Sequence, residues 1–302
     1  MKDRPEGLSD AALATTLRAW GIAEVPVYAP VGFGDYHWTA GRWFVTATDL
    51  AHRPDPGPAL AAAAKLGLDC VVAPVPTPGG DLVVRAGERY GVSVFPLVEG
   101  ESGHFGQRLP GERRRVVLDA LAELHGRRAP VGLPVHSPVP ESRPHLDRAL
   151  AALDQPWTAG PYGEPARKLV RAEAARLRAR LAEFDHTAAT LDGRANMVVT
   201  HGEPHPGNLL WHDGRVKLID WDTVALAHPE RDLWLAATEP GDLDHYAHVS
   251  GREPDPRLLG FYRLRWQLDD LAVYLELFRA PHTEGGDAAD SWRYFQDTLT
   301  AL

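Results

Sequence analysis

The chain has 302 residues, with 32 Lys and Arg against 41 Asp and Glu, which gives a net charge of −9. Hydrophobic residues make up 44% and charged residues 24%, proportions that are typical of a folded chain and exclude wholesale disorder. The acidic balance argues against a general nucleic-acid binder and is compatible with small cationic partners. No apolar run approaches the roughly 18 residues that a membrane span needs, and the charged N-terminus is unlike a signal peptide. A single cysteine, Cys70, excludes an internal disulfide, so we expect a cytoplasmic protein with no nucleic-acid or membrane partner.

The first hundred residues predict a small β-rich lobe. Ser9 is a suitable N-cap for a helix that runs to Trp20 and ends at Gly21, and a second helix is expected over 59–66. Strands are expected in segments rich in β-branched and aromatic residues and separated by proline and glycine, namely 25–29, 43–48, 70–75, 82–85 and 91–97.

The character of the chain changes after residue 98. Long segments with apolar residues at helical spacing predict amphipathic helices over 111–125, 142–153, 164–186 and 261–279. The length favours two lobes. We therefore predict an α+β, bilobal fold, with an N-terminal lobe over 1–98, a hinge near 95–100 and a larger, mainly helical lobe over 99–302.

The densest polar cluster interrupts this helical region. His201, Gly202 and Glu203 follow a β-like apolar run, and Asn208 comes five residues after Glu203 in a loop stiffened by prolines. A hairpin whose turn is formed by 212–214 then delivers Asp220. Phosphoryl transfer needs such an inventory: a carboxylate that accepts the proton of an attacking hydroxyl, and oxygen ligands for Mg²⁺. Glu203 would be the base, and Asn208 and Asp220 would be the metal ligands.

At these residues the sequence resembles the aminoglycoside phosphotransferase and choline kinase-like family, and is closest in character to spectinomycin-type antibiotic phosphotransferases. The loop from His201 to Asn208 has the spacing of a kinase catalytic loop, and Ile219, Asp220 and Trp221 match the metal-binding strand. The resemblance implies a protein-kinase-like fold. It also implies supporting roles near the catalytic loop for His201, for Asp222 and for Asp232, which would brace the loop.

The N-terminal lobe departs from the family pattern. Family members carry a strand lysine that binds the nucleotide phosphates and pairs with a helix glutamate, but Thr46 stands at the expected lysine position and the helix over 59–66 has no glutamate. Lys65 and Arg85 are the cations we consider as replacements. Gly32 and Gly34 could let backbone N–H groups approach phosphate, although an ordinary hairpin turn explains them nearly as well.

Further site residues follow from the resemblance. The purine would meet backbone groups at the hinge, at Pro96 and Val98. The acceptor would contact the loop and the C-terminal helix, through His205, Trp266, Asp269, Asp270 and Tyr274. The alternative for the helix is an ordinary amphipathic packing face with its acids in water.

These observations predict a small-molecule O-phosphotransferase that uses Mg²⁺ and ATP or GTP. Its acceptor would be a hydroxyl of an aminoglycoside, aminocyclitol or nucleoside antibiotic, which would give resistance by inactivation. A kinase of an ordinary metabolite alcohol has the same motifs. A noncatalytic nucleotide-binding module is the second alternative, because Glu203 stands where most relatives have aspartate. The helical zinc motif of a hydrolase would need His201 and His205 on one helix face, which Pro204 and Pro206 prevent. A zinc site built from the loop itself is the hydrolase alternative that stays open.

Overall fold

A computed structural model of the chain describes residues 1–191 and 196–302. Contacts divide the chain into two compact units, one combining Met1–His136 with Asn196–Pro254 and the other combining Ser137–Ala195 with Asp255–Leu302. The predicted lobes, 1–98 and 99–302, are single continuous segments, whereas each of these units combines two segments. The predicted lobe boundary at residue 98 therefore stays a prediction. Among the described helices, none has the length and apolar character needed to cross a membrane.

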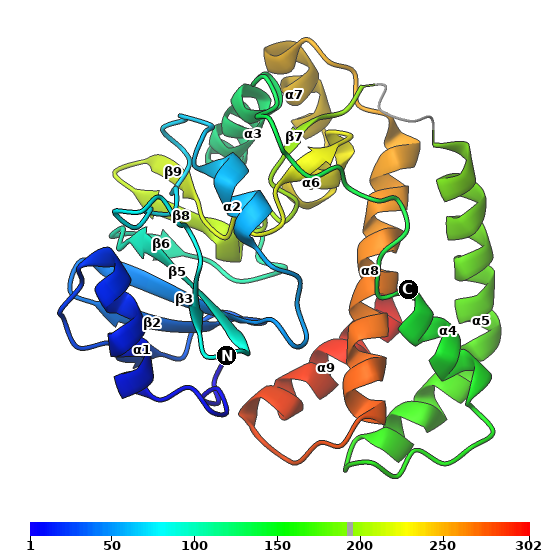
Figure 1. The fold of residues 1–302 in the computed structure, drawn as a ribbon. Helices are drawn as coiled ribbons and strands as arrows, with labels where there is room; N and C mark the ends of the chain where they lie inside the picture. Colours follow the sequence, from blue (N-terminus) through cyan, green and yellow to red (C-terminus); the bar gives the residue numbers. More distant parts are fainter. Residues whose placement is uncertain (192–195) are drawn as a thin grey trace. The chain divides into compact units, whose positions relative to one another are not determined.

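The N-terminal part of the first unit is built on an antiparallel five-stranded sheet in the order β1-β2-β3-β5-β4 (Figure 1). Its strands are β1 (Val27–Ala29), β2 (Tyr36–Ala40), β3 (Trp43–Asp49), β4 (Val84–Ala86) and β5 (Tyr90–Pro96). Successive side chains of a strand point to opposite faces. In β3, Val45 and Ala47 therefore enter the hydrophobic core, whereas Thr46 and Thr48 belong to the other face.

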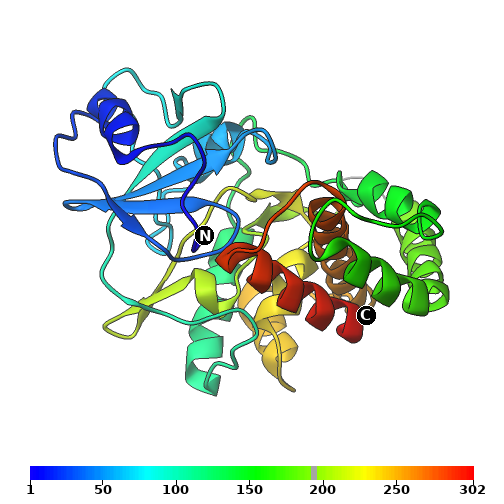
Figure 2. The ribbon, with the colours of Figure 1, turned by 90° about the horizontal axis from the view of Figure 1, so that it is seen from below.

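Helix α1 (Asp10–Leu17) covers the core face of this sheet (Figure 2). The Ser9 hydroxyl accepts the Ala12 N–H at 3.2 Å and starts the helix, as predicted. The helix continues into a 3₁₀ turn, η1 (Arg18–Trp20), and this helical segment ends at Gly21. The φ of 73° at Gly21 is a left-handed conformation that favours glycine.

For the sheet, one predicted strand was wrong and one strand was missed. The segment 70–75 forms only an isolated bridge, between Val71 and Leu218, because Pro74 interrupts it and cannot donate a backbone hydrogen bond. Sequence analysis also missed β2, whose His37 and Thr39 interrupt the hydrophobic pattern on the face away from the core.

The remainder of the first unit surrounds helix α3 (Gly111–His125), which contacts α6, α7, β7 and β9. Its other elements are α2 (Gly57–Ala63), β6 (Glu101–Ser102), β7 (Val198–Thr200), η2 (Pro206–Asn208), β8 (Leu209–His212), β9 (Arg215–Leu218), β10 (Ala225–Ala227), α6 (Glu230–Ala236) and α7 (Asp242–Ser250). The predicted hairpin is confirmed: Asp213 and Gly214 join β8 to β9 with φ values of 48° and 73°.

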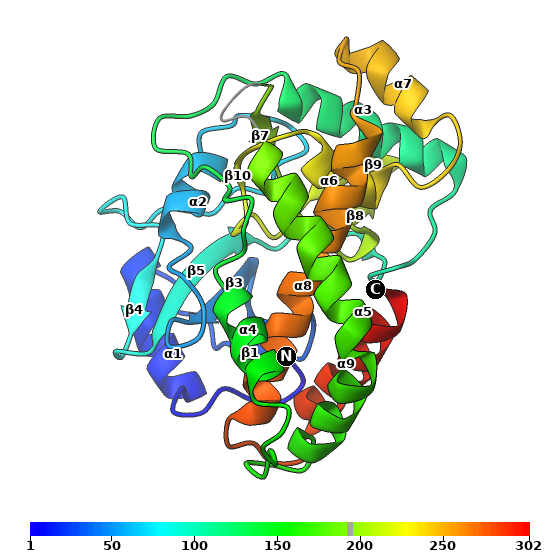
Figure 3. The same cartoon turned by 90° about the vertical axis from the view of Figure 1, so that its right-hand side faces the viewer.

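The second unit is helical. Its helices are α4 (Arg143–Ala151), α5 (Gly163–Thr190), α8 (Pro256–Arg279) and α9 (Gly286–Ala301), and α8 contacts the other three (Figure 3). All four predicted amphipathic helices are present, and the largest differences are that α8 starts five residues earlier and α5 ends four residues later than predicted. An antiparallel N-terminal sheet followed by a mainly helical C-terminal region confirms the predicted α+β class.

Candidate active site

The polar cluster found in the sequence forms the loop between β7 and β8. Gly202 has φ 106°, and a Cβ on it would lie 2.3 Å from Nη2 of Arg231, so this position requires glycine for both backbone conformation and space. Pro204 and Pro206 are buried and fix the turn that leads into η2. The loop is therefore a rigid bend that presents residues 203–208.

His201 is fully buried and ties the loop to the neighbouring strand. Its Nε2 donates to the Ile219 carbonyl at 2.8 Å, and its Nδ1 accepts the Glu203 N–H at 3.3 Å, an assignment that requires the neutral ring. Burial lowers the pKa of His201, which favours that neutral form. The ring also packs on Trp221, with centroids 4.5 Å apart. Both ring nitrogens are used within the protein, as expected for a histidine that stiffens the loop.

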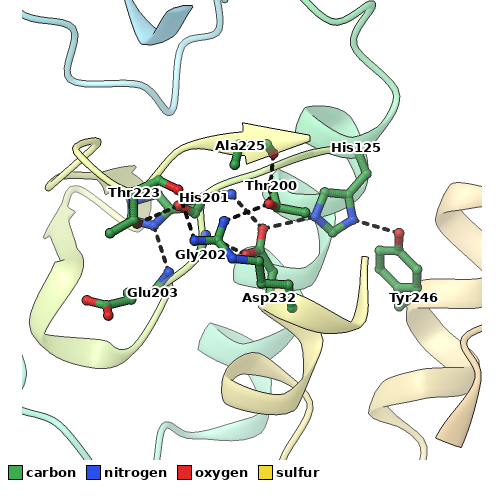
Figure 4. A network of polar contacts seen from close by, with 10 residues as sticks. His125, Thr200, His201, Gly202, Glu203, Thr223, Ala225, Asp232 and Tyr246 are labelled. Carbon is green, nitrogen blue, oxygen red and sulfur yellow. Dashed lines mark hydrogen bonds and ion pairs between the residues drawn. The ribbon is translucent and has the colours of Figure 1, made fainter. Parts of the chain in front are cut away.

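Asp232 of α6 holds the same loop from below (Figure 4). Its Oδ2 accepts the His201 N–H at 2.8 Å, and its Oδ1 accepts the Gly202 N–H at 2.6 Å. The His125 Nε2 donates to Oδ2 at 3.0 Å, and the Tyr246 hydroxyl lies 2.7 Å from the other ring nitrogen of His125. Burial alone would raise the pKa of Asp232, but the His125 hydrogen bond and nearby positive charge keep it below the ordinary value.

A second clamp comes from Arg231, the neighbour of Asp232. Its guanidinium donates to the Thr200 hydroxyl and to the Thr223 carbonyl, both at 2.9 Å. The Thr223 hydroxyl in turn donates to the His201 carbonyl at 2.9 Å. These bonds connect the start of the loop to the segment after Asp220, so the loop and the segment predicted to hold the metal are joined.

Glu203, Asn208 and Asp220 are brought together by this framework. The Asn208 amide nitrogen donates to the Glu203 carbonyl at 3.0 Å, which leaves the amide oxygen as the acceptor of that side chain. The Ile219 N–H donates to the Asn208 carbonyl at 3.1 Å, so Asp220 follows directly from a residue bonded to the loop. In Figure 4 the Glu203 carboxylate points away from the Asp232 network.

The electrostatics of Asp220 are unusual. It is a non-glycine residue with φ 66°, a conformation that costs about 1–2 kcal/mol. Burial of the site and the negative charges of Asp222 and Glu203 raise the pKa of Asp220 well above its ordinary value. Asp220 is exposed to solvent, so a cation could reach it. A bound cation would offset the repulsion from Asp222 and Glu203 and so lower the pKa of Asp220 again.

The donor set fits magnesium better than zinc. Mg²⁺ keeps several water ligands and needs one or two protein oxygens besides substrate phosphates, whereas zinc takes three or four protein ligands. Within residues 1–191 and 196–302 no group of three or more His, Cys, Asp and Glu side chains is arranged to hold a metal. Both ring nitrogens of His201 are engaged within the protein, and Nδ1 of His205 accepts the Gly207 N–H at 3.1 Å. These hydrogen bonds leave His201 without a free nitrogen for zinc.

Sequence analysis missed two charged residues beside this site, Arg53 and Asp35. The Arg53 Nη2 donates to Oδ2 of Asp222 at 2.8 Å, and its Nη1 lies 3.2 Å from Oδ1 of Asp35. Asp35 is 5% exposed and burial raises its pKa to about 6, an effect that Arg53 opposes. Arg53 lies in a loop with no motif around it, and a contact across 169 positions of the chain leaves no local signal.

The predicted nucleotide residues lie in the N-terminal part of the first unit. Gly32 and Gly34 have φ values of 71° and 98°, so the expected glycine turn is present. Thr46 lies on the sheet face away from the core, within 3.2 Å of the His37 ring. The rest of the set is at the strand ends or at the surface: Lys65 and Arg85 are exposed, Pro96 is the exposed last residue of β5, and Val98 is half-buried. Their roles remain predictions.

The predicted acceptor residues of α8 are engaged within the second unit. Asp269 accepts a hydrogen bond from the Ser142 hydroxyl and lies 3.4 Å from Arg265, and Asp270 accepts the Thr298 hydroxyl at 2.7 Å. Tyr274 is only 4% exposed, and burial together with Asp270 raises its pKa. Trp266 is half-buried. The alternative expected the acids of this helix in water, whereas both are half-buried and hydrogen-bonded within the unit. Nothing here tests substrate binding, so the acceptor role stays a prediction.

The comparisons with known proteins agree with this geometry. The model of the phosphotransferase enzyme family, APH, matches residues 36–277. Protein StrN of Streptomyces griseus is 32% identical over 281 residues, which are 87% of this chain and 82% of that protein.

Two solved structures share the fold. A spectinomycin phosphotransferase in complex with ADP and spectinomycin superposes with a TM-score of 0.76 at 17% identity, covering 98% of each chain. The GDP and kanamycin complex of APH(2")-IIia gives a TM-score of 0.60 at 16% identity, covering 96% of this chain and 97% of that one. These likenesses confirm the predicted kinase-like fold.

Proposed function

Because this chain belongs to the phosphotransferase enzyme family, we propose that it transfers the γ-phosphate of ATP or GTP to a hydroxyl of a small antibiotic. The observation that carries the proposal is the convergence of Glu203, Asn208 and Asp220 on one rigid bend, through the Asn208–Glu203 and Ile219–Asn208 hydrogen bonds. The two solved structures hold ADP in one case and GDP in the other, which supports a nucleotide donor of either kind.

In the proposed reaction the chain supplies position and proton transfer. Glu203 orients the acceptor hydroxyl and takes its proton as the oxygen attacks the γ-phosphorus, while the nucleoside diphosphate leaves. Asn208 and Asp220 would hold Mg²⁺, with Asp222 as a further carboxylate. When bound, this ion would neutralise charge on the phosphate oxygens. The bend, fixed by Asp232, keeps these groups in place without reorganisation during the reaction.

The antibiotic class of acceptor is supported by the names of the similar structures, which are complexes with spectinomycin and kanamycin. An ordinary metabolite alcohol would need the same three residues. The third outcome, binding of nucleotide without transfer, is favoured by a specific observation, the glutamate at position 203. Its side chain is one methylene longer than aspartate, so the carboxylate must be accommodated about 1.5 Å further from the backbone.

The test is a panel of hydroxylated compounds, including aminoglycosides, aminocyclitols, nucleoside antibiotics and metabolite alcohols. Each is incubated with the wild-type protein, Mg²⁺ and ATP or GTP, and transfer is read by a phosphoryl mass shift of the acceptor. Transfer to an antibiotic, with resistance on expression, is the expected result. Transfer to a metabolite alcohol alone would replace the acceptor class, and nucleotide binding with no transfer to any compound would overturn the enzyme assignment.

The base is tested on the substrate found. We expect Glu203→Ala to lower kcat by about 10²–10⁴-fold, because general-base assistance is typically worth that much. Glu253→Ala removes an exposed carboxylate from the same unit and serves as the matched control. An unchanged kcat for Glu203→Ala would show that another group takes the proton.

A further inference from the structure

The proposed reaction leaves one charge unexplained. Nucleotide phosphates need a protein cation, and the lysine expected on β3 is replaced by Thr46. His37 lies beside Thr46, but burial lowers its pKa to about 3, so its ring is neutral. Lys65 is exposed, and the exposed Arg85 donates from Nη1 to the Glu88 carbonyl. None of these four is a charged group placed against the acidic site.

Arg53 is such a group. Its guanidinium contacts Asp222, two residues after the proposed metal ligand Asp220, and on its other side Asp35, the residue that follows the glycine turn. A Cβ on Gly34 would lie 2.5 Å from Nη1 of Arg53, so the guanidinium packs directly on that turn. Arg53 therefore occupies the space between the turn predicted to cradle phosphate and the strand predicted to hold the metal.

The backbone of Arg53 is fixed by the end of β3. The Asp49 carbonyl accepts the Arg53 N–H at 2.9 Å, and the Asp49 side chain accepts the Ala51 N–H at 3.1 Å. Arg89 forms a bidentate ion pair with the same carboxylate. The turn over residues 49–53 is therefore fixed by hydrogen bonds before any ligand binds. This reduces the conformational entropy that the Arg53 backbone loses when Arg53 binds a ligand.

Asp35 is an unusual partner. One of its oxygens accepts the Thr48 hydroxyl at 3.1 Å, but the other, Oδ1, is buried without a hydrogen bond from any residue that the structure describes. Its neighbour at 3.2 Å is Nη1 of Arg53, with which it forms an ion pair. Arg53 contributes the larger compensating charge for this buried carboxylate, and the Met1 ammonium contributes a smaller one.

The acids around Arg53 outnumber it. Four carboxylates act on its charge, namely Asp222, Asp35, Asp220 and Glu203. Its side chain keeps 33% of its surface exposed. A guanidinium has five N–H donors, and the contacts with Asp35 and Asp222 leave further donors for a ligand. Planar guanidinium groups suit phosphate because two parallel N–H bonds can form.

We propose that Arg53 binds the phosphates of the donor nucleotide in place of the strand lysine, and that Asp35 positions its guanidinium for this. The Arg53–Asp35 pair thereby replaces a lysine–glutamate pair with residues from two loops. This inference rests on the proposed function, because it presupposes that the chain binds a nucleotide.

The test compares two ligands that differ only in phosphate. Binding of ADP with Mg²⁺ and of adenosine is measured by calorimetry, or of GDP and guanosine if the wild type prefers guanine. We expect Arg53→Met to weaken binding of the diphosphate by about 10–100-fold and to leave nucleoside binding unchanged, because hydrogen bonds to charged groups have this magnitude. Arg53→Lys keeps the charge and should recover part of the loss. Arg215→Met removes an arginine that is 80% exposed and is the matched control.

Asp35→Asn separates positioning from binding. We expect a smaller loss of diphosphate affinity, about 3–10-fold, again without loss of nucleoside affinity. Thermal melting of each variant identifies any that fail to fold, and Arg53→Lys then decides the result. Equal loss of diphosphate and nucleoside binding in Arg53→Met would show that Arg53 acts only in holding the fold.

The outcomes for the two proposals are distinguishable. Normal ADP binding by Arg53→Met would overturn the role of Arg53 and leave the proposed function standing. A loss of ADP affinity in Lys65→Met or Arg85→Met would then assign the phosphate contact to that residue. A wild-type chain that binds neither diphosphate would overturn the proposed function and the role of Arg53 with it.

Discussion

Asp232 provides the most direct test of how the bend over residues 201–208 is held. Its carboxylate accepts three hydrogen bonds, from the His201 and Gly202 backbone and from His125, and its side chain is fully buried. Asp232→Asn keeps the shape but replaces one acceptor oxygen with an NH₂ group. Whichever way the amide turns, it places a donor against at least one backbone N–H.

The expected cost follows from these contacts. A hydrogen bond to a charged group contributes about 1.5–3 kcal/mol, and a buried donor left without a partner costs about 1–3 kcal/mol. Since such terms are not additive, we expect Asp232→Asn to lower the free energy of unfolding by about 3–5 kcal/mol, as for other broken buried pairs. Tyr246→Phe removes the outer bond to His125 together with the contact of the same hydroxyl with Ser250, and should cost about 1 kcal/mol.

Equilibrium urea unfolding measures both values, with tryptophan fluorescence as the probe because the buried Trp221 packs on His201. The matched control is Asp213→Asn, the same chemical change at an exposed hairpin turn, where asparagine tolerates the positive φ and the cost should stay within about 0.5 kcal/mol. A loss below about 1 kcal/mol for Asp232→Asn, at an unchanged denaturant slope, would refute the reasoning that this carboxylate braces the loop.

Two further predictions concern the same loop. Gly202→Ala should lower the free energy of unfolding by at least about 2 kcal/mol, because backbone strain of about 1–3 kcal/mol adds to a clash with Arg231. Gly214→Ala introduces backbone strain at a positive φ but meets no neighbouring atom, so it should cost less in the same urea unfolding measurement. His205 has a pKa of about 4 when folded and near 6.5 when unfolded, so the unfolded chain binds the proton first and stability falls as the pH drops from 6.5 to 4, by at most about 3 kcal/mol. His205→Asn keeps an acceptor for the Gly207 N–H and should lose less stability over that range; equal losses would contradict the assignment.

The bend over residues 201–208 could be predicted from the sequence because its determinants are local. Glu203 and Asn208 lie five positions apart, the prolines exclude a helix, and the turn at Asp213 and Gly214 fixes how Asp220 returns. Short spacing and strong turn preferences leave few alternative conformations.

The residues that sequence analysis missed depend on contacts between distant segments. Asp35 and Arg53 can be recognised only when the glycine turn, the loop after β3 and the turn that contains Asp222 meet, and no periodicity in the sequence indicates that contact. The acids of α8 show the opposite problem. Asp269 and Asp270 lie on the helix that the family resemblance assigns to the substrate, yet each has a partner within its own unit, which residue type alone could not reveal.

The absence of a lysine on β3 therefore says little by itself about activity. What phosphate binding requires is a positive charge at a point in space, and that charge can come from any segment that passes near it. In this chain Thr46 replaces the lysine and is hydrogen-bonded to the neutral His37, and α2 has alanine and leucine but no glutamate. Both members of the lysine–glutamate pair are therefore missing together. An arginine from the adjoining loop lies against the acids instead. If only the lysine were lost, the glutamate would remain as an isolated buried charge, which is strongly destabilising. The loss of both residues avoids that cost, so an arginine from another segment can take over the phosphate charge.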